Sequence, residues 1–416
     1  MKIKLNTKVI GTKVIGAFLG TIIEYYNYSL YTFSIGIIAA KFFPNTDHIT
    51  SLMYVFAIYA TAYATKPIGA IFFGRIGDVY GRKIVLTITI IGMAIPTVII
   101  GLLPVYALIG SWSTAVLVLS RLMQGAFVGG GYDGAAIYVI EHLGDKYRSM
   151  ASALARCTGA LGLLLGISAT SFFGSPIFPE WGWRIPFWIS LPLALIVLCF
   201  RQQLAETPDF IKNKEKRLEI ENFGTLLKNQ WRMILMVVFL SGSFGATYQI
   251  AIIFMKQYLP IVMPQAAFLI STFSIWIIVC FTIAMPISGW LADRFSEIIV
   301  VRVGLFGTIL TSAFFIMAVK NGMFHLVLVS CFMLACFVAP INALAHGIFV
   351  KYLPVHNRHR TISLGHAIGS MLMGGNANYV CLVGMKHFNF NLFPIVYLTL
   401  FAIIAYGVVQ NFEKRL

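Results

Sequence analysis

The sequence predicts an all-α membrane protein with twelve transmembrane helices in two pseudo-symmetric six-helix halves. Three observations predict this fold: the composition, the number of long apolar runs, and a short motif that occurs once in each half. Of the 416 residues, 59% are hydrophobic and only 11% are charged, and the mean hydropathy is +0.84. Soluble domains have about 45–50% apolar and about 25% charged residues. The chain therefore has too few charges to cover a soluble surface.

The apolar runs are separated by charged residues, proline or glycine. Each run approaches the roughly 20 residues that a helix needs to cross a bilayer. The expected spans are 14–41, 50–74, 84–104, 113–141, 150–173 and 184–201 in the first half, and 233–258, 266–290, 299–319, 324–350, 362–386 and 392–411 in the second. The longest polar stretch lies between the two sets. We therefore expect a first half (1–201), an amphipathic linker (202–231) and a second half (232–416).

The formal charge of +16 is concentrated in the short connections between the apolar runs. Twenty-three lysines and arginines fall on one side of the predicted membrane and five on the other, while Lys66, Arg121 and Arg156 lie inside spans. This is the positive-inside pattern, and it predicts a plasma (inner) membrane protein whose termini and linker are cytoplasmic. The expected surroundings are the lipid bilayer, and nucleic acid is not an expected partner.

Motifs of ATP-driven pumps and membrane enzymes do not occur in the chain. There is no GxxxxGK[ST], HExxH or GxSxG sequence, and the six cysteines have no metal-ligand spacing. We therefore expect no enzyme activity, no cofactor and no metal, and a monomeric carrier of a small molecule.

A short motif is repeated at the same place in each half. GRIGDVYGRK (74–83) follows the second span, and GWLADRFSEI (289–298) follows the eighth. Both contain Gly-x-x-x-Asp followed by a basic residue, and two related six-helix halves are the architecture of major facilitator transporters. A generic basic loop would not explain the second copy. The motif and the loop after span four predict these cytoplasmic gating residues: Gly74, Asp78, Arg82, Glu141, Arg148, Gly289, Asp293 and Arg294. We expect Glu141 and Arg148 to pair with the 74–83 loop.

Longer stretches resemble one branch of this superfamily, the metabolite:proton symporters. They are EYYNYSLY (24–31), KPIGAIFFGRIGDVYGRK (66–83), RLMQGAFVGGG (121–131), WGWRIPFWIS (181–190), AETPDF (205–210) and YLPVHNRHRTISLG (352–365). That family includes carriers of proline and glycine betaine, of 2-oxoglutarate and citrate, and of shikimate. The resemblance implies the major facilitator fold and proton-coupled transport.

Three positions depart from the family pattern. Asn27 and Gly131 stand where the family usually has Asp and Glu, and Lys66 stands where it usually has Arg. The acids that couple protons in the family are therefore not carried over to this chain. A transporter-like protein that has lost proton coupling remains an alternative.

Polar side chains occur at membrane depth in the first span. Glu24 lies about 15 Å along this helix at about 1.5 Å per residue, near the midplane. Its i, i+3, i+4 and i+7 spacing puts Asn27, Tyr28 and Tyr31 on the same face. Lipid cannot satisfy this face, so we expect it to line a transport cavity, with Glu24 as a proton-coupling residue. A structural polar seam between helices is the alternative.

Further charges lie in the fourth and fifth spans. Asp133 and Arg156 are at similar depth on antiparallel neighbours, so we expect an ion pair that takes part in proton coupling. A static buried pair is the alternative. Arg121 is expected to bind a substrate carboxylate or to pair structurally.

The second half supplies amides and an aromatic residue where the cavity should be. The expected substrate-binding residues there are Tyr248, Gln249, Asn342 and Asn376. Hydrogen bonds between helices are the alternative role for each of them. Asn378, His346 and His366 are also polar residues inside spans.

Together these features predict a secondary transporter that works by alternating access. The leading hypothesis is proton-coupled uptake of a small zwitterion such as proline or betaine. A di- or tricarboxylate symporter, a carrier without proton coupling and an exporter are the alternatives.

Overall fold

The computed structural model describes residues 7–44, 46–80, 82–143, 145–202, 223–264, 267–353 and 358–414, and these ranges contain helices and no strand. The first half has α1 (Thr7–Phe33), α2 (Ile35–Phe42), α3 (His48–Tyr80), α4 (Arg82–Leu102), α5 (Tyr106–Ile109), α6 (Ser111–Leu143), α7 (Arg148–Phe173) and α8 (Ile185–Gln202), with 3₁₀ turns η1 (Asp145–Tyr147) and η2 (Gly182–Arg184).

The second half contains two π-helices among its α-helices. Its elements are α10 (Phe223–Tyr248), π-helix η3 (Gln249–Phe254), α11 (Met255–Val262), α12 (Ala267–Arg294), α13 (Glu297–Lys320), α14 (Phe324–Tyr352), α15 (Arg358–Gly369), π-helix η5 (Ser370–Gly374), α16 (Ala377–Phe388) and α17 (Phe393–Lys414). The expected linker is partly helical, because α10 begins at Phe223. Residues 203–222 lie outside the described residues.

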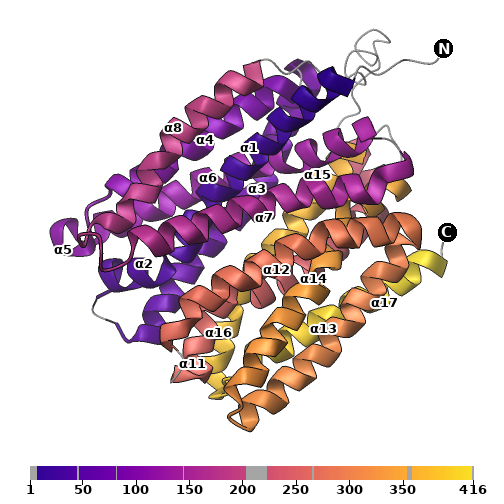
Figure 1. Cartoon of the computed structure of the whole chain (residues 1–416). Helices are drawn as coiled ribbons and strands as arrows, with labels where there is room; N and C mark the ends of the chain where they lie inside the picture. The colour runs from indigo at the N-terminus through magenta and orange to yellow at the C-terminus, as the bar shows by residue number, and fades with distance from the viewer. Residues whose placement is uncertain are drawn as a thin grey trace, which may run out of the picture.

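The two halves lie side by side, and both ends of the chain are at the same end of the bundle (Figure 1). Helices α7 and α12 pack against each other at the boundary between the halves. Nine of the described helical segments are long and apolar enough to cross a membrane. The other three expected spans correspond to α1, α6 and the composite α15–η5–α16, so the predicted twelve-helix arrangement is confirmed. These three contain the buried polar residues Glu24, Asp133 and Asn378.

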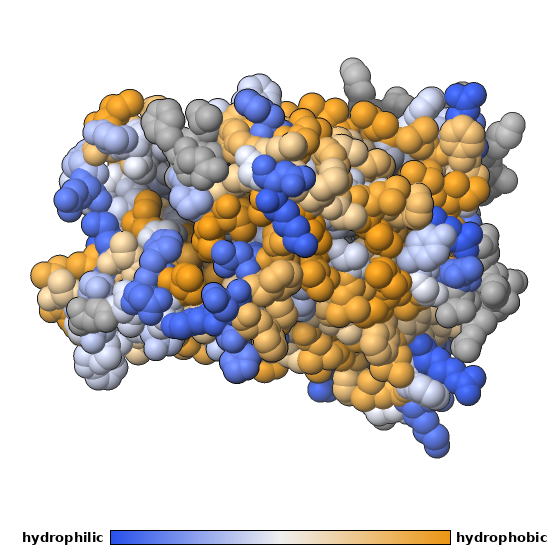
Figure 2. Space-filling model, turned by 90° about the horizontal axis from the view of Figure 1, so that it is seen from below, coloured by the Kyte–Doolittle hydropathy of each residue, from blue (hydrophilic) through white to orange (hydrophobic). Residues whose placement is uncertain are grey.

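The outer surface is apolar across the middle of the molecule. Figure 2 shows a hydrophobic band, with hydrophilic side chains gathered toward the two ends. Large apolar side chains such as Ile287, Phe306 and Leu310 are more than half exposed. Such a surface is stable against lipid tails and not against water, which agrees with a membrane-spanning bundle.

Glycines allow α3 and α6 to pack backbone to backbone. A Cβ at Gly125 would lie 1.8 Å from the carbonyl oxygen of Ala62, and one at Gly69 would lie 1.8 Å from that of Ala126. Small residues at helix interfaces serve this purpose in membrane bundles. Helices α3 and α6 are therefore in close contact within the first half.

Candidate substrate and proton site

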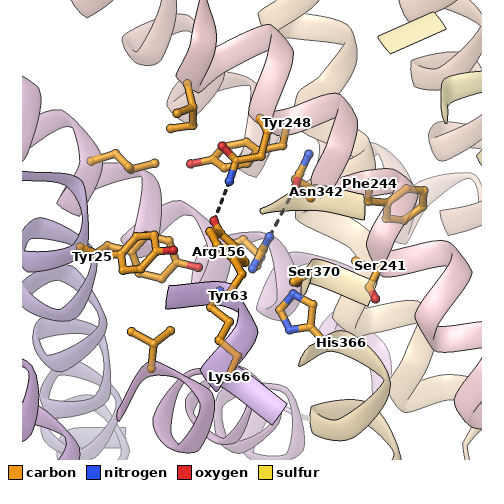
Figure 3. Close-up of a pocket in the computed structure, with 18 of the residues that line it drawn as sticks. Tyr25, Tyr63, Lys66, Arg156, Ser241, Phe244, Tyr248, Asn342, His366 and Ser370 are labelled. Carbon is orange, nitrogen blue, oxygen red and sulfur yellow. Dashed lines mark hydrogen bonds between the residues drawn. The ribbon is translucent and has the colours of Figure 1, made fainter. Parts of the chain in front are cut away.

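A narrow cavity of about 80 Å³ lies between the two halves. Its walls combine aromatic rings with polar and charged groups (Figure 3). From the first half they include Glu24, Tyr25, Tyr28, Tyr59, Tyr63, Lys66 and Arg156, and from the second half Ser241, Phe244, Tyr248, Gln249, Asn342, His346, His366 and Ser370. The cavity therefore contains five of the residues predicted for substrate binding: Glu24, Tyr28, Tyr248, Gln249 and Asn342.

An amide–phenol network joins the halves at one side of the cavity. Gln249 Nε2 donates to the hydroxyl oxygens of Tyr63 (2.6 Å) and Tyr59 (3.0 Å). Asn378 Nδ2 donates to Gln249 Oε1 at 3.3 Å. Gln249 begins the π-helix η3, whose wider turn is frequent at functional sites. The network links α3 of the first half to η3 and α16 of the second.

Arg156 makes a second link between the halves. Its Nη2 donates to Asn342 Oδ1 at 3.4 Å, from α7 to α14 (Figure 3). Lys66 Nζ lies 4.0 Å from the ring centroid of Tyr63 and 5.4 Å from that of Tyr28, which is cation–π distance. Among the described residues, the cavity wall thus carries one carboxylate, Glu24, and two cations, Lys66 and Arg156.

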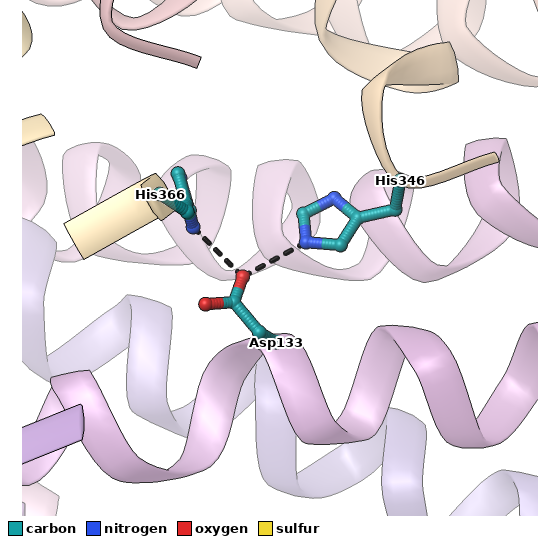
Figure 4. A group of neighbouring side chains, drawn as sticks. All are labelled: Asp133, His346 and His366. Atoms are coloured by element: carbon teal, nitrogen blue, oxygen red, sulfur yellow. Dashed lines mark hydrogen bonds and ion pairs between the residues drawn. The ribbon is translucent and has the colours of Figure 1, made fainter. Parts of the chain in front are cut away.

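Asp133 is held by two histidines, which was not predicted. His346 Nε2 lies 2.8 Å and His366 Nδ1 lies 2.7 Å from the same oxygen, Asp133 Oδ1 (Figure 4). Packing explains these contacts: α14 and α15 both lie against α6 and bring their histidines to the carboxylate, while Arg156 reaches Asn342. The expected ion pair between Asp133 and Arg156 stays a prediction.

The same three side chains have the composition of a metal site. Their ligand atoms all lie within 4.8 Å of one another. A zinc ion would sit about 2.0–2.2 Å from each ligand, which spreads tetrahedral ligands to more than about 3 Å apart. The contacts of 2.7 and 2.8 Å are instead hydrogen-bond lengths. The geometry is that of a carboxylate accepting two N–H donors.

Asn27 and Tyr31 are not among the described residues that line the cavity. Ser190 Oγ donates to Asn27 Oδ1 at 2.7 Å, which ties α1 to α8. Tyr31 donates to the carbonyl of Val55 at 2.9 Å. A role for either residue in substrate binding stays a prediction.

Arg121 and Asn376 also lie outside the lining. The Arg121 guanidinium is fully buried, donates to Gln124 Oε1 at 2.6 Å, and lies over three tyrosine rings. The distances to the centroids of Tyr28, Tyr31 and Tyr59 are 4.7, 4.4 and 5.2 Å. Asn376 Nδ2 donates to the carbonyl of Met371 at 3.0 Å, so this amide closes the turn after η5. Their predicted contacts with substrate remain untested.

The second copy of the Gly-x-x-x-Asp motif joins the two halves at the end of the bundle where the termini lie. Asp293 accepts the backbone N–H groups of Ser149 and Met150, each at 3.0 Å, at the N-terminus of α7. A carboxylate is favourable there because the unpaired N–H groups of a helix carry partial positive charge. A Cβ at Gly289 would lie 2.6 Å from that of Ala153. Glycine therefore lets α12 approach α7.

The other predicted gating residues lie around this contact. Arg148 Nε lies 3.2 Å from Glu297 Oε1, so a described partner of Arg148 is in the second half and not in the 74–83 loop. Gly74 has no heavy atom within 4 Å of an added Cβ. Arg294 is exposed near the rings of Trp290 and Phe295. The side chains of Asp78, Arg82 and Glu141 lie outside the described residues.

Polar contacts also join the halves at the opposite end. Lys386 Nζ lies 3.5 Å from Asp47 Oδ1 and 2.5 Å from Thr50 Oγ1, and Lys256 Nζ donates to the carbonyl of Phe33 at 3.2 Å. Asp47 caps α3, and the hydrogen bonds from Thr50 lower the pKa of its carboxyl. The halves are thus in contact both above and below the cavity.

Two joined helical halves around a polar, partly charged cavity define a membrane carrier that works by alternating access. The sequence matches the Major Facilitator Superfamily over residues 17–377. This chain belongs to that superfamily, and it is a multi-pass transporter of small molecules rather than an enzyme.

The curated relatives include carriers of osmolytes. A putative proline/betaine transporter of Staphylococcus aureus (strain MSSA476) is 32% identical over 95% of this chain and 86% of its own length. A glycine betaine/proline/ectoine/pipecolic acid transporter of Dickeya dadantii is 28% identical over 87% of this chain and 75% of its own length. Among solved structures, the proton:xylose symporter bound to 6-bromo-6-deoxy-D-glucose has a TM-score of 0.79 at 17% identity, covering 98% of this chain and 96% of that one.

Proposed function

We propose that this protein imports a small zwitterion, of the proline or betaine type, together with protons. It would do so across the plasma (inner) membrane as a monomer, with both termini cytoplasmic. The observation that carries the proposal is the charge layout of the cavity: one carboxylate and aromatic rings on α1, with cations on α3 and α7. The names of the relatives point to the same substrates.

A zwitterion fits this layout group by group. Its ammonium or quaternary nitrogen would lie near Glu24 and the faces of Tyr25 and Tyr28, because aromatic faces attract such cations. Its carboxylate would lie near Arg156 or Lys66, since charge-assisted hydrogen bonds are the strong ones. Tyr248, Gln249 and Asn342 would complete the site from the second half. Both halves would then contact one ligand, as alternating access requires.

For proton coupling we propose Glu24 and Asp133, with Arg156 as the cation that balances the cavity. Intramembrane acids are functional by default, because holding them there is costly. We propose that Asp293, Arg148 and Gly289 form the cytoplasmic gate. Residues 1–201 and 232–416 would move as the two halves, joined by the linker 202–231.

The test is uptake into proteoliposomes with an inside-alkaline pH gradient. We expect labelled proline or glycine betaine to accumulate, and a protonophore to abolish this. Glu24→Gln should lower gradient-driven accumulation at least tenfold. Glu180→Gln is the matched control, because this acid is exposed at the end opposite the termini, where its contact to Lys41 is 3.8 Å. Equal accumulation by wild type and Glu24→Gln would refute the role of Glu24.

A dicarboxylate is the second candidate. Lys66 and Arg156 both line the cavity against a single acid, which favours a net negative ligand. Competition decides between the two. If 2-oxoglutarate or citrate inhibits uptake strongly and betaine does not, the zwitterion proposal is wrong.

A further inference from the structure

We propose that His346 and His366, held on Asp133, bind and release the transported proton, and that their contact with Asp133 ties proton binding to closure of the cytoplasmic side. The inference rests on the proton coupling in the proposed function and names the group that carries it. Neither histidine is needed for the zwitterion site described above.

The three side chains bridge the two halves. Asp133 is on α6 of the first half, while His346 is on α14 and His366 on α15 of the second (Figure 4). Both histidines contact the same carboxylate oxygen, at 2.8 and 2.7 Å. The two hydrogen bonds therefore exist only while α14 and α15 are packed against α6.

The bridge lies between the cavity and the cytoplasmic gate. Asp133 is roughly 15 Å from the end of α6 at Leu143, and His346 roughly 9 Å from the end of α14 at Tyr352, at about 1.5 Å per residue. His366 is roughly 12 Å from the start of α15 at Arg358 by the same rise. Opening of this end of the bundle must pull the bridge apart.

The hydrogen bonds indicate where a proton would be added. An ionised carboxylate only accepts hydrogen bonds, so His346 Nε2 and His366 Nδ1 both carry hydrogen in this arrangement. An incoming proton then binds a ring nitrogen of His346 or His366, and the resulting imidazolium still donates its N–H to Asp133. Both histidines line the cavity, so the proton can arrive by the path of the substrate.

Asp133 determines whether a positive charge on the histidines is favourable, because the other cations nearby oppose it. The described charged and titratable groups in the same cavity are Glu24, Tyr25 and Tyr28 on α1, Tyr59, Tyr63 and Lys66 on α3, Arg156 on α7 and Tyr248 on α10. Lys66 and Arg156 oppose a further positive charge, while a carboxylate within hydrogen-bond distance favours it.

This arrangement links the proton to the conformation. In the closed form, an imidazolium has Asp133 as its partner. When α14 and α15 leave α6, the imidazolium loses that partner and is exposed to the cytoplasm. The loss of the carboxylate removes the contact that favours the charged imidazolium, so the proton is released there. The proton would thus leave on the side where the substrate leaves.

The test uses His346→Gln and His366→Gln, which keep an amide N–H donor but cannot titrate. The matched control is His325→Gln, on the same helix as His346 but exposed at its other end. Two measurements are made on each reconstituted protein: accumulation of labelled proline or betaine driven by a pH gradient, and exchange of that substrate at equal pH. We expect each cavity variant to lose at least tenfold in accumulation, which corresponds to about 1.4 kcal/mol. Exchange at equal pH should stay within about threefold of the wild type.

Two results would overturn the inference. One is accumulation by both glutamine variants at the level of the control. The other is an equal loss of accumulation and exchange, which would mean that the histidines only support the structure. Failure of the proposed function looks different, because the wild-type protein itself would then show no response to the pH gradient.

Discussion

Asn27 lies on the same helix face and at a similar membrane depth as Glu24 and Tyr28, but its described hydrogen bond is with another helix. Glu24 and Tyr28, on the same predicted helix face, line the cavity. Asn27 instead accepts a hydrogen bond from Ser190 on α8. Spacing along one helix defines a face about 100° wide, and it cannot tell which neighbouring helix meets each edge of that face.

This pair can be tested by removing its donor. In Ser190→Ala, the buried Asn27 Oδ1 loses the hydroxyl, and an unsatisfied buried acceptor costs about 1–3 kcal/mol. We expect a lower midpoint of thermal unfolding in detergent. Ser175→Ala is the control, because this exposed hydroxyl donates to the carbonyl of Phe172, three residues earlier in the chain. Equal midpoints for the two variants would contradict a structural role for the pair.

The histidines on Asp133 could not be predicted from the sequence by the same argument. They are 213 and 233 residues away from it in the chain. Their presence inside apolar segments was the only signal. Which residues of one half meet a given residue of the other depends on how the halves dock, and local patterns contain no information about that.

At the scale of the element, long apolar runs predicted the helices well because the bilayer sets their length. Boundaries were less accurate where polar residues continue a helix. α10 begins at Phe223, ten residues before the expected span. The π-helices η3 and η5 were not predicted, since their wider turns have no distinct sequence pattern.

The packing of α3 on α6 gives a prediction for one glycine. Gly125→Ala would place a methyl group 1.8 Å from the carbonyl oxygen of Ala62, so the two helices must separate. We expect a loss of about 1–3 kcal/mol, the usual cost of overpacking, seen as a lower unfolding midpoint and poorer yield of folded protein.

The control for that variant is Gly407→Ala in α17. No heavy atom lies within 4 Å of a Cβ at Gly407, and alanine favours helix over glycine by up to about 1 kcal/mol. This variant should be neutral or slightly stabilised. If both glycine variants behave alike, close helix approach is not what the α3–α6 contact requires.

At the scale of the whole molecule, the two ends of the cavity are closed by different kinds of contact. Near the termini, Asp293 binds the start of α7, and Gly289 packs tightly against that helix. At the other end, the Lys386–Asp47 pair is largely exposed. Exposed ion pairs contribute about 0–1 kcal/mol. The end near the termini is therefore expected to hold the halves together more firmly.

Two variants test this difference. Asp293→Asn weakens the charge on the α7 N-terminus, and we expect the end near the termini to open more often. Lys386→Met should change little. Labelling of a cysteine placed in the cavity, with a reagent added from the side on which the termini lie, measures the opening. We expect labelling at least fivefold faster in Asp293→Asn, and equal rates in the two variants would contradict the assignment of this gate.

The two π-helices have a consequence for the phase of the helices that contain them. Each π turn accommodates an extra residue, so positions after it are rotated by about 100° relative to a continuous α-helix. Asn376 lies just after η5. Its amide donates to the carbonyl of Met371, five residues earlier in the chain. An alignment of this chain with a carrier that lacks the extra residue would need a one-position gap there, or Asn378, which donates to Gln249, would be assigned to the wrong helix face.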